Sequence, residues 1–151
     1  KGPLDLLSIS KNCFEKIKEK SQGRNINLEV SSNWSSNGLS SSIQGDKDLI
    51  VKAMTFLFEN AWKFTKEVEV AVISLGTEKI NGEDFFYLHN NGPQLKNLED
   101  IFTLFYGKRS GHQSGGLGLG LPFARVIFEK HGGDLRAKND EGSGVKFYFR
   151  F

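Results

Sequence analysis

Three side chains with different chemistry fall on one face of a predicted helix. Asn60, Lys63 and Phe64 are three and four residues apart within residues 58–64, and residues at this spacing share a helical face. An amide oxygen, an ammonium group and an aromatic ring on one face could serve a magnesium ion, a phosphate and a flat base, respectively. A frayed polar helix end is the alternative interpretation of the same residues.

A second pattern is rich in glycine and lies at the start of another predicted helix. Residues 115–122 read Gly-Gly-Leu-Gly-Leu-Gly-Leu-Pro. Glycines let backbone amides approach an anion closely, and a helix N-terminus adds unsatisfied N–H groups and a favourable dipole. A polyphosphate is therefore a physically sensible ligand, and an ordinary loop is the alternative.

Two shorter patterns have the composition of turns. Residues 89–93, His-Asn-Asn-Gly-Pro, follow a predicted strand, and residues 142–144, Gly-Ser-Gly, separate the last two predicted strands. Taken singly, each is explained by a tight turn.

The elements that position these patterns follow from the hydrophobic period. Ile50, Met54, Leu57 and Ala61 form one apolar stripe at helical spacing, and the Asp46 side chain can cap that helix. The predicted order is a helix over residues 4–19, a strand over 26–30, a polar loop over 31–42 with a possible short return strand, a helix over 46–65, strands over 68–75 and 84–89 joined by a turn at 81–82, a short helix over 98–105, a glycine-rich segment over 106–116, a helix over 120–131 and two closing strands.

This order favours an α+β fold. Strands and three long helices are mixed without strict alternation, which predicts a two-layer sandwich with a mixed sheet rather than a Rossmann-type sheet. A chain of 151 residues without an internal repeat or linker fits one domain, residues 1–151.

Composition argues against several functional classes. The formal charge of +2 comes from 20 basic and 18 acidic residues without a long basic run, so we expect no nucleic acid and no direct membrane contact. The single Cys13 excludes an internal disulfide and a cysteine-built metal site, which is compatible with a reducing compartment. The first residues do not resemble a signal peptide, and no stretch has the length of a membrane span, so we expect a soluble fragment.

Together and in this order, the four patterns resemble the N, G1, G2 and G3 boxes of the GHKL ATPases, the superfamily of gyrase, Hsp90, MutL and histidine kinases. Residues 101–108, Ile-Phe-Thr-Leu-Phe-Tyr-Gly-Lys, are similar to the F box of sensor kinases. His131 with the two following glycines and the phenylalanine-rich final strand are also typical of that branch. The chain therefore resembles the ATP-binding catalytic domain of a sensor histidine kinase over nearly its whole length.

The resemblance implies a Bergerat-type sandwich with ATP and Mg²⁺ held between the second long helix, the loop after Asn90, a lid over residues 106–116 and the glycine-rich turn. Asn60 would hold the metal, Lys63 with Lys108 or Arg109 would contact phosphate oxygens, and Asn60, Lys63 and Lys108 would be the catalytic positions. The full set of implied nucleotide-binding residues is Asn60, Lys63, Phe64, Asn90, Gly92, Lys108, Arg109, Gly116, Leu117, Gly118, Leu119 and Gly120.

The implied reaction transfers the γ-phosphoryl group of ATP to a histidine on a separate helical dimerisation domain of the same kinase, and a response regulator would be an indirect partner. None of His89, His112 and His131 follows the pattern of a phosphoacceptor, so we expect that histidine upstream of Lys1 or on another chain. The implied location is cytoplasmic. Membrane attachment of the parent protein stays open.

Three residues depart from the family pattern. Asn90 replaces the aspartate that accepts a hydrogen bond from the adenine amino group, and losing that charge would cost about 1 kcal/mol, a fall in ATP affinity approaching tenfold. Gln94 replaces a glycine, which would strain the loop if its φ were positive. Phe56 replaces a polar residue one turn before Asn60, which predicts poor ATP hydrolysis and reduced autokinase activity.

These departures leave two other interpretations open. One is a degenerate pseudokinase that binds a nucleotide or serves as an interaction module. The other is a serine-directed anti-sigma-type kinase of the same superfamily, against which the sensor-like F box argues.

Overall fold

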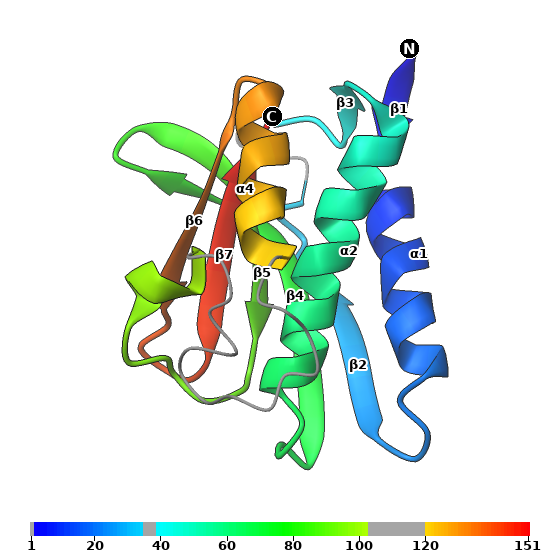
Figure 1. The fold of residues 1–151 in the computed structure, drawn as a ribbon, viewed down its shortest axis with the longest axis vertical. Coiled ribbons are helices and arrows are strands. Elements are labelled where there is room, and N and C mark those ends of the chain that lie inside the picture. Colours follow the sequence, from blue (N-terminus) through cyan, green and yellow to red (C-terminus); the bar gives the residue numbers. More distant parts are fainter. Residues whose placement is uncertain (1, 35–38, 103–119) are drawn as a thin grey trace.

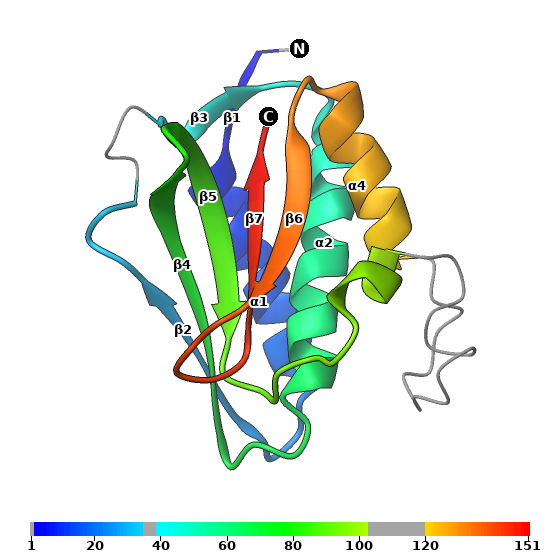
Figure 2. The same cartoon turned by 90° about the vertical axis from the view of Figure 1, so that its left-hand side faces the viewer.

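The computed structural model describes residues 2–34, 39–102 and 120–151. Three helices, α1 (Leu6–Glu19), α2 (Lys47–Phe64) and α4 (Gly120–Lys130), lie side by side in one layer. A five-stranded sheet forms the other layer, as the side view in Figure 2 shows. The expected two-layer α+β sandwich is confirmed (Figure 1).

The sheet is mixed. Its order is β2 (Asn25–Val30), β4 (Val70–Ile80), β5 (Glu83–Asn90), β7 (Val145–Arg150) and β6 (Asp134–Asn139). Only the β2–β4 pair is parallel. Asn81 (φ 51°) and Gly82 (φ 84°) turn the chain between β4 and β5, which is the left-handed backbone that an Asn-Gly hairpin turn requires. A 3₁₀ helix, η1 (Leu98–Phe102), precedes the segment that leads to α4.

The start of the chain differs from the prediction. Residues 4 and 5 were expected to be helical, but they belong to β1 (Pro3–Asp5), which pairs antiparallel with β3 (Ser42–Gln44) in a separate two-stranded sheet. The helix begins only at Leu6 because the Asp5 side chain caps it, accepting from the Leu7 N–H at 3.1 Å. Hydrogen bonds from the Ser8 and Ser41 hydroxyls hold the pKa of Asp5 below its ordinary value.

The second long helix matches its predicted bounds at both ends. Asp46 caps α2 by accepting from the Leu49 N–H at 3.1 Å. At the other end, the Arg24 guanidinium donates to the carbonyl oxygens of Trp62 at 3.0 Å and of Thr65 at 2.9 Å. Neither carbonyl accepts from a backbone N–H of the helix; the Trp62 carbonyl also accepts from the Thr65 hydroxyl, and the Thr65 carbonyl from the Val68 N–H. Arg24 thus anchors the C-terminal end of α2 to the start of β2.

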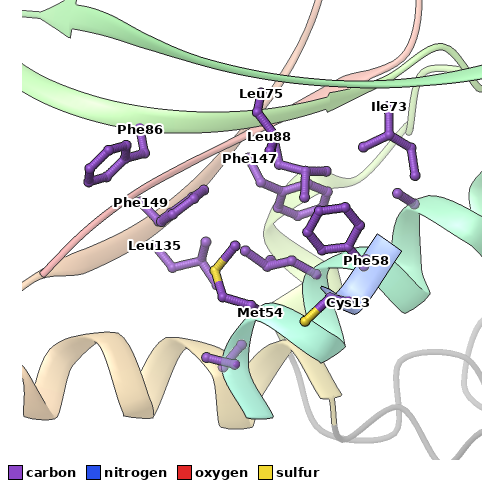
Figure 3. Packing of buried hydrophobic residues seen from close by; sticks show 14 of the residues in the cluster. Cys13, Met54, Phe58, Ile73, Leu75, Phe86, Leu88, Leu135, Phe147 and Phe149 are labelled. Carbon is purple, nitrogen blue, oxygen red and sulfur yellow. The ribbon is translucent and has the colours of Figure 1, made fainter. Parts of the chain in front are cut away.

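The hydrophobic core lies between the two layers. The predicted stripe of Ile50, Met54, Leu57 and Ala61 is fully buried, and Figure 3 shows side chains of α2 facing those of the sheet. The sheet residues Ile73, Leu75, Phe86, Leu88, Leu135, Phe147 and Phe149 belong to the same cluster. In the described parts of the chain, no helix is both long and apolar enough to cross a bilayer.

The turn between β6 and β7 depends on Gly144. Its φ is +75°, and a Cβ atom there would lie 1.7 Å from the Asn90 carbonyl oxygen. Gly142, two residues earlier, has only Asp140 Oδ2 near its Cβ position, at 3.9 Å. The turn backbone can therefore pack on the end of β5 only if residue 144 is glycine.

We predict that Gly144→Ala lowers the free energy of unfolding by at least ~2 kcal/mol, because strain and a backbone clash add. Gly142→Ala is the matched control and should change it by less than ~0.5 kcal/mol. Urea unfolding followed by circular dichroism measures both. Equal effects of the two substitutions would contradict this role of Gly144.

Candidate functional site

Asn60 lies in the last two turns of α2 and is half-buried. Its Nδ2 donates to the Phe56 carbonyl oxygen one turn earlier, at 2.8 Å. This hydrogen bond sets the orientation of the side-chain amide, because the atom facing a carbonyl oxygen must be the NH₂ group. The Oδ1 atom has no hydrogen-bond partner among the described residues. Asn60 therefore presents a free, oriented oxygen, the type of ligand that magnesium takes from proteins.

Lys63 and Phe64 follow on the same stretch of α2. Both are half-buried, so they lie at the rim between the core and solvent. Within the residues the structure describes, the Lys63 ammonium makes no ion pair. The helix thus carries an amide oxygen, an uncommitted cation and an aromatic ring within five residues.

Asn90 ends β5 beneath this part of α2. It is 0% exposed and alternates with Phe86 and Leu88, so its side chain is on the face covered by the helices. The Asn90 Oδ1 accepts from the Gly92 N–H at 2.9 Å. The structure therefore places a buried amide at the corner where the sheet meets the helices.

Gly92 brings the two elements into contact. A Cβ atom at Gly92 would lie 2.3 Å from the Phe64 carbonyl oxygen, so only glycine allows the loop after β5 to pass against the end of α2. Asn90, Gly92 and Phe64, which are distant in the sequence, consequently share one corner.

Asn91 supports this corner and was not recognised from the sequence. Its Oδ1 accepts from the Val72 N–H at 2.8 Å, and its Nδ2 donates to the Val70 carbonyl oxygen at 2.9 Å. The side chain thereby makes the two hydrogen bonds that the backbone of a neighbouring strand would otherwise make to the first residues of β4. The pattern Asn-Asn-Gly could have suggested a turn, but a partner about twenty residues away on another strand leaves no local signal.

Gln94 does not have a positive φ, so the condition under which it would strain the loop is not met. Asn81 is the one non-glycine residue with positive φ in the described ranges. Gln94 instead donates through Nε2 to the Asp140 carbonyl oxygen at 2.5 Å. The next residue, Leu95, exchanges two backbone hydrogen bonds with the Asn139 side chain, at 2.9 and 2.8 Å. The loop after Asn90 is therefore attached to the end of β6.

Phe56 packs against the start of α4. A Cβ atom at Gly120, the first residue of α4, would lie 3.1 Å from the Phe56 ring. The N-terminus of α4 therefore lies one turn of α2 away from Asn60. The first N–H groups of an α-helix have no partner within the helix, and the helix dipole at this end favours an anion.

Several predicted site residues fall outside the described residues. These are Lys108, Arg109, Gly116, Leu117, Gly118 and Leu119, together with the rest of the predicted lid and His112. Asn60, Lys63, Phe64, Asn90, Gly92 and Gly120 are described and come together around the C-terminal half of α2.

The two described histidines, His89 and His131, form hydrogen bonds with backbone groups. His131 donates from Nδ1 to the Ile127 carbonyl oxygen at 2.8 Å and accepts the Asp46 N–H at Nε2, at 3.1 Å. It therefore joins the end of α4 to the start of α2, at the end of α2 opposite to Asn60 (Figure 1). The His89 Nε2 lies 2.8 Å from the Ser143 carbonyl oxygen and 3.3 Å from Asp140 Oδ2.

The described residues contain no cluster of three or more acidic, histidine or cysteine side chains that could hold a metal on its own. A single oxygen from Asn60 suits magnesium that is bound chiefly through the phosphates of a nucleotide and through water. The residues present thus fit a magnesium–nucleotide complex rather than a permanent metal centre.

The sequence of this chain is similar to those of known sensor proteins. The sensor protein SrrB of Staphylococcus aureus strain NCTC 8325 is 28% identical over 139 residues, which cover 89% of this chain and 23% of SrrB. This chain therefore spans about a quarter of that relative's length.

Solved structures show the same fold. The mycobacterial sensor histidine kinase MprB matches with a TM-score of 0.72 and 19% identity, covering 97% of this chain and 93% of that one. The catalytic domain of the histidine kinase ThkA matches with a TM-score of 0.70 and 24% identity, covering 97% and 93%.

The profile of the histidine kinase-, DNA gyrase B- and HSP90-like ATPases matches residues 45–151, which include α2, β5 and α4 and thus every described site residue. The chain therefore belongs to this ATPase family, and its fold is that of histidine kinase catalytic domains.

Proposed function

We propose that this domain binds Mg-ATP in the corner between the C-terminal half of α2, the loop after β5 and the N-terminus of α4. The observation that carries the proposal is the oriented, free Oδ1 of Asn60 one helical turn from the start of α4. A metal ligand beside a helix N-terminus suits the polyphosphate of a nucleotide and its magnesium ion.

Each described residue has a role in this proposal. Asn60 holds the metal through Oδ1, and Lys63 neutralises charge on the phosphate oxygens. Phe64 lies beside the base, and Asn90 with Gly92 meets its edge. The phosphate-binding roles that the family resemblance implies for Lys108, Arg109, Gly116, Leu117, Gly118, Leu119 and Gly120 complete the site.

The proposed reaction is phosphoryl transfer to histidine. A nitrogen of the acceptor imidazole supplies the electron pair for the new N–P bond, and the bond from the γ-phosphorus to the bridging oxygen breaks, so ADP leaves with that electron pair. Bound Mg²⁺ would supply charge neutralisation at the β- and γ-phosphate oxygens. This chain's own residues act by positioning and electrostatics, because none of them forms a covalent intermediate.

The proposed partner is a helical dimerisation domain of the same kinase that carries the acceptor histidine. Among the structures that share this fold, full-length ShkA was solved in complex with AMPPNP, so a kinase of this fold binds that nucleotide. A response regulator would then receive the phosphoryl group from that histidine, and a cytoplasmic location of the domain is part of the same proposal.

Phe56 favours a second candidate function, a nucleotide-binding module that does not transfer phosphate. Its ring packs on Gly120 next to the proposed phosphate site, where it can neither bind metal nor orient water. Phe56, together with Asn90 in place of a carboxylate, is the specific observation that favours a nucleotide-binding module without phosphoryl transfer.

We predict that Asn60→Ala weakens Mg-ATP binding about tenfold or more and removes its dependence on magnesium, because the single protein oxygen for the metal is lost. Glu59→Gln is the matched control: its side chain points about 100° away around the helix, and it should bind as the wild type does. Titration calorimetry with and without magnesium measures both. Unchanged binding by Asn60→Ala would exclude this metal role.

We also expect Lys63→Gln to weaken ATP binding about tenfold, because a charge-assisted contact with phosphate is replaced by a neutral one. Lys66→Gln removes a charge just beyond the end of α2 and serves as the control, with a change below about twofold. Titration calorimetry again measures both. If both substitutions weaken binding equally, the contribution of Lys63 is only general electrostatic attraction.

A transfer assay separates the two candidate functions. The domain is mixed with labelled ATP and with the phosphoacceptor domain of its own sensor protein. The kinase proposal predicts an acid-labile, alkali-stable label on that partner, which disappears when the acceptor histidine is replaced by glutamine. If the domain binds ATP tightly but no label appears on the partner, the kinase proposal is rejected and the nucleotide-binding module is the remaining function.

A further inference from the structure

The side-chain amide of Asn90 has an unusual hydrogen-bond state. The side chain is 0% exposed, and its Oδ1 accepts from the Gly92 N–H at 2.9 Å. The Asn90 Nδ2 is buried and has no hydrogen-bond partner in the described part of the chain. Buried amide donors are nearly always paired, so an unpaired one calls for an explanation.

The orientation of this amide follows from its neighbour. A backbone N–H can only donate, so the atom that faces Gly92 must be the oxygen. A flipped amide would place two donors against each other and leave the Gly92 N–H without its partner. Asn90 therefore directs its NH₂ group to the side away from the Gly92 N–H.

The position of Asn90 in the fold places this donor at the corner of the proposed site. Phe86, Leu88 and Asn90 alternate on the sheet face that the helices cover, and the close approach of Gly92 to Phe64 puts Asn90 beside the end of α2. In the proposed site, this corner is where the edge of the base lies. The following inference rests on that proposed function.

We propose that Asn90 determines base specificity and that the site takes 6-oxopurine nucleoside triphosphates in preference to ATP. The purine C6 substituent is an amino donor in adenine and a carbonyl acceptor in hypoxanthine and guanine. A donor from Asn90 pairs with the carbonyl but meets the adenine amino group donor to donor. A carboxylate in the same place would have the opposite preference.

ATP can still bind to this site, but with lower affinity. The Asn90 Oδ1 has a second lone pair that could accept from the adenine amino group, but Nδ2 would then stay buried without a partner. A 6-oxopurine nucleotide therefore gains one hydrogen bond, to Nδ2, that ATP does not make in this mode. We therefore expect a preference of about tenfold rather than exclusion of ATP.

The test compares Mg-ATP with Mg-ITP, which differ only at C6 and at the protonation of N1. Titration calorimetry should show that the wild-type domain binds Mg-ITP about tenfold more tightly than Mg-ATP, and that Asn90→Asp reverses the order. Asn97→Asp is the matched control, because it introduces the same charge on an exposed side chain further along the loop that follows β5. It should leave the ratio unchanged.

The outcomes separate this inference from the proposed function. If the wild type binds Mg-ATP more tightly than Mg-ITP, the specificity inference is overturned while the nucleotide site stands. If neither nucleotide binds to a folded wild type or a folded Asn90→Asp, the nucleotide site itself is refuted, and the inference with it. The wild-type ratio decides the question even if Asn90→Asp does not fold.

Discussion

The contact between the end of α2 and the end of β5 is the constraint on which the rest of the structure depends. Gly92 passes so close to the Phe64 carbonyl oxygen that any side chain at residue 92 would collide with it. Arg24 holds the same end of the helix through the carbonyls of Trp62 and Thr65. The helix that carries Asn60 and the strand that ends in Asn90 are thus fixed relative to each other.

Backbone contacts position α2 and β5 relative to each other, and most polar side chains near this contact already have hydrogen-bond partners within the protein. Gly144 packs on the Asn90 carbonyl oxygen, while Asn91 and Gln94 are committed to β4 and to the end of β6. Two polar atoms on the elements that this contact joins, Asn60 Oδ1 and Asn90 Nδ2, have no hydrogen-bond partner among the described residues. A rigid frame with uncommitted polar atoms suits a binding site, because rigid elements hold a ligand more precisely than mobile ones.

Features with local signals could be predicted from the sequence, and features with distant partners could not. The Asp46 cap and the apolar stripe gave α2 its bounds, and the Asn-Gly pair gave the β4–β5 hairpin. The β1–β3 pairing and the Gln94–Asp140 hydrogen bond join residues about forty positions apart. For Asn90, the sequence indicated a lost charge, but only the Gly92 N–H shows which atom of the amide remains unpaired.

The most direct test of the account is a nucleotide titration of the isotopically labelled domain followed by NMR. The account predicts that shifts concentrate at the Asn60 and Asn90 side-chain amides and at the backbone amides of Gly92 and Gly120, whichever purine is bound. The His131 end of α2 should be unaffected. Shifts confined to another surface, or no shifts at several millimolar nucleotide, would contradict the claim that this corner is the nucleotide site.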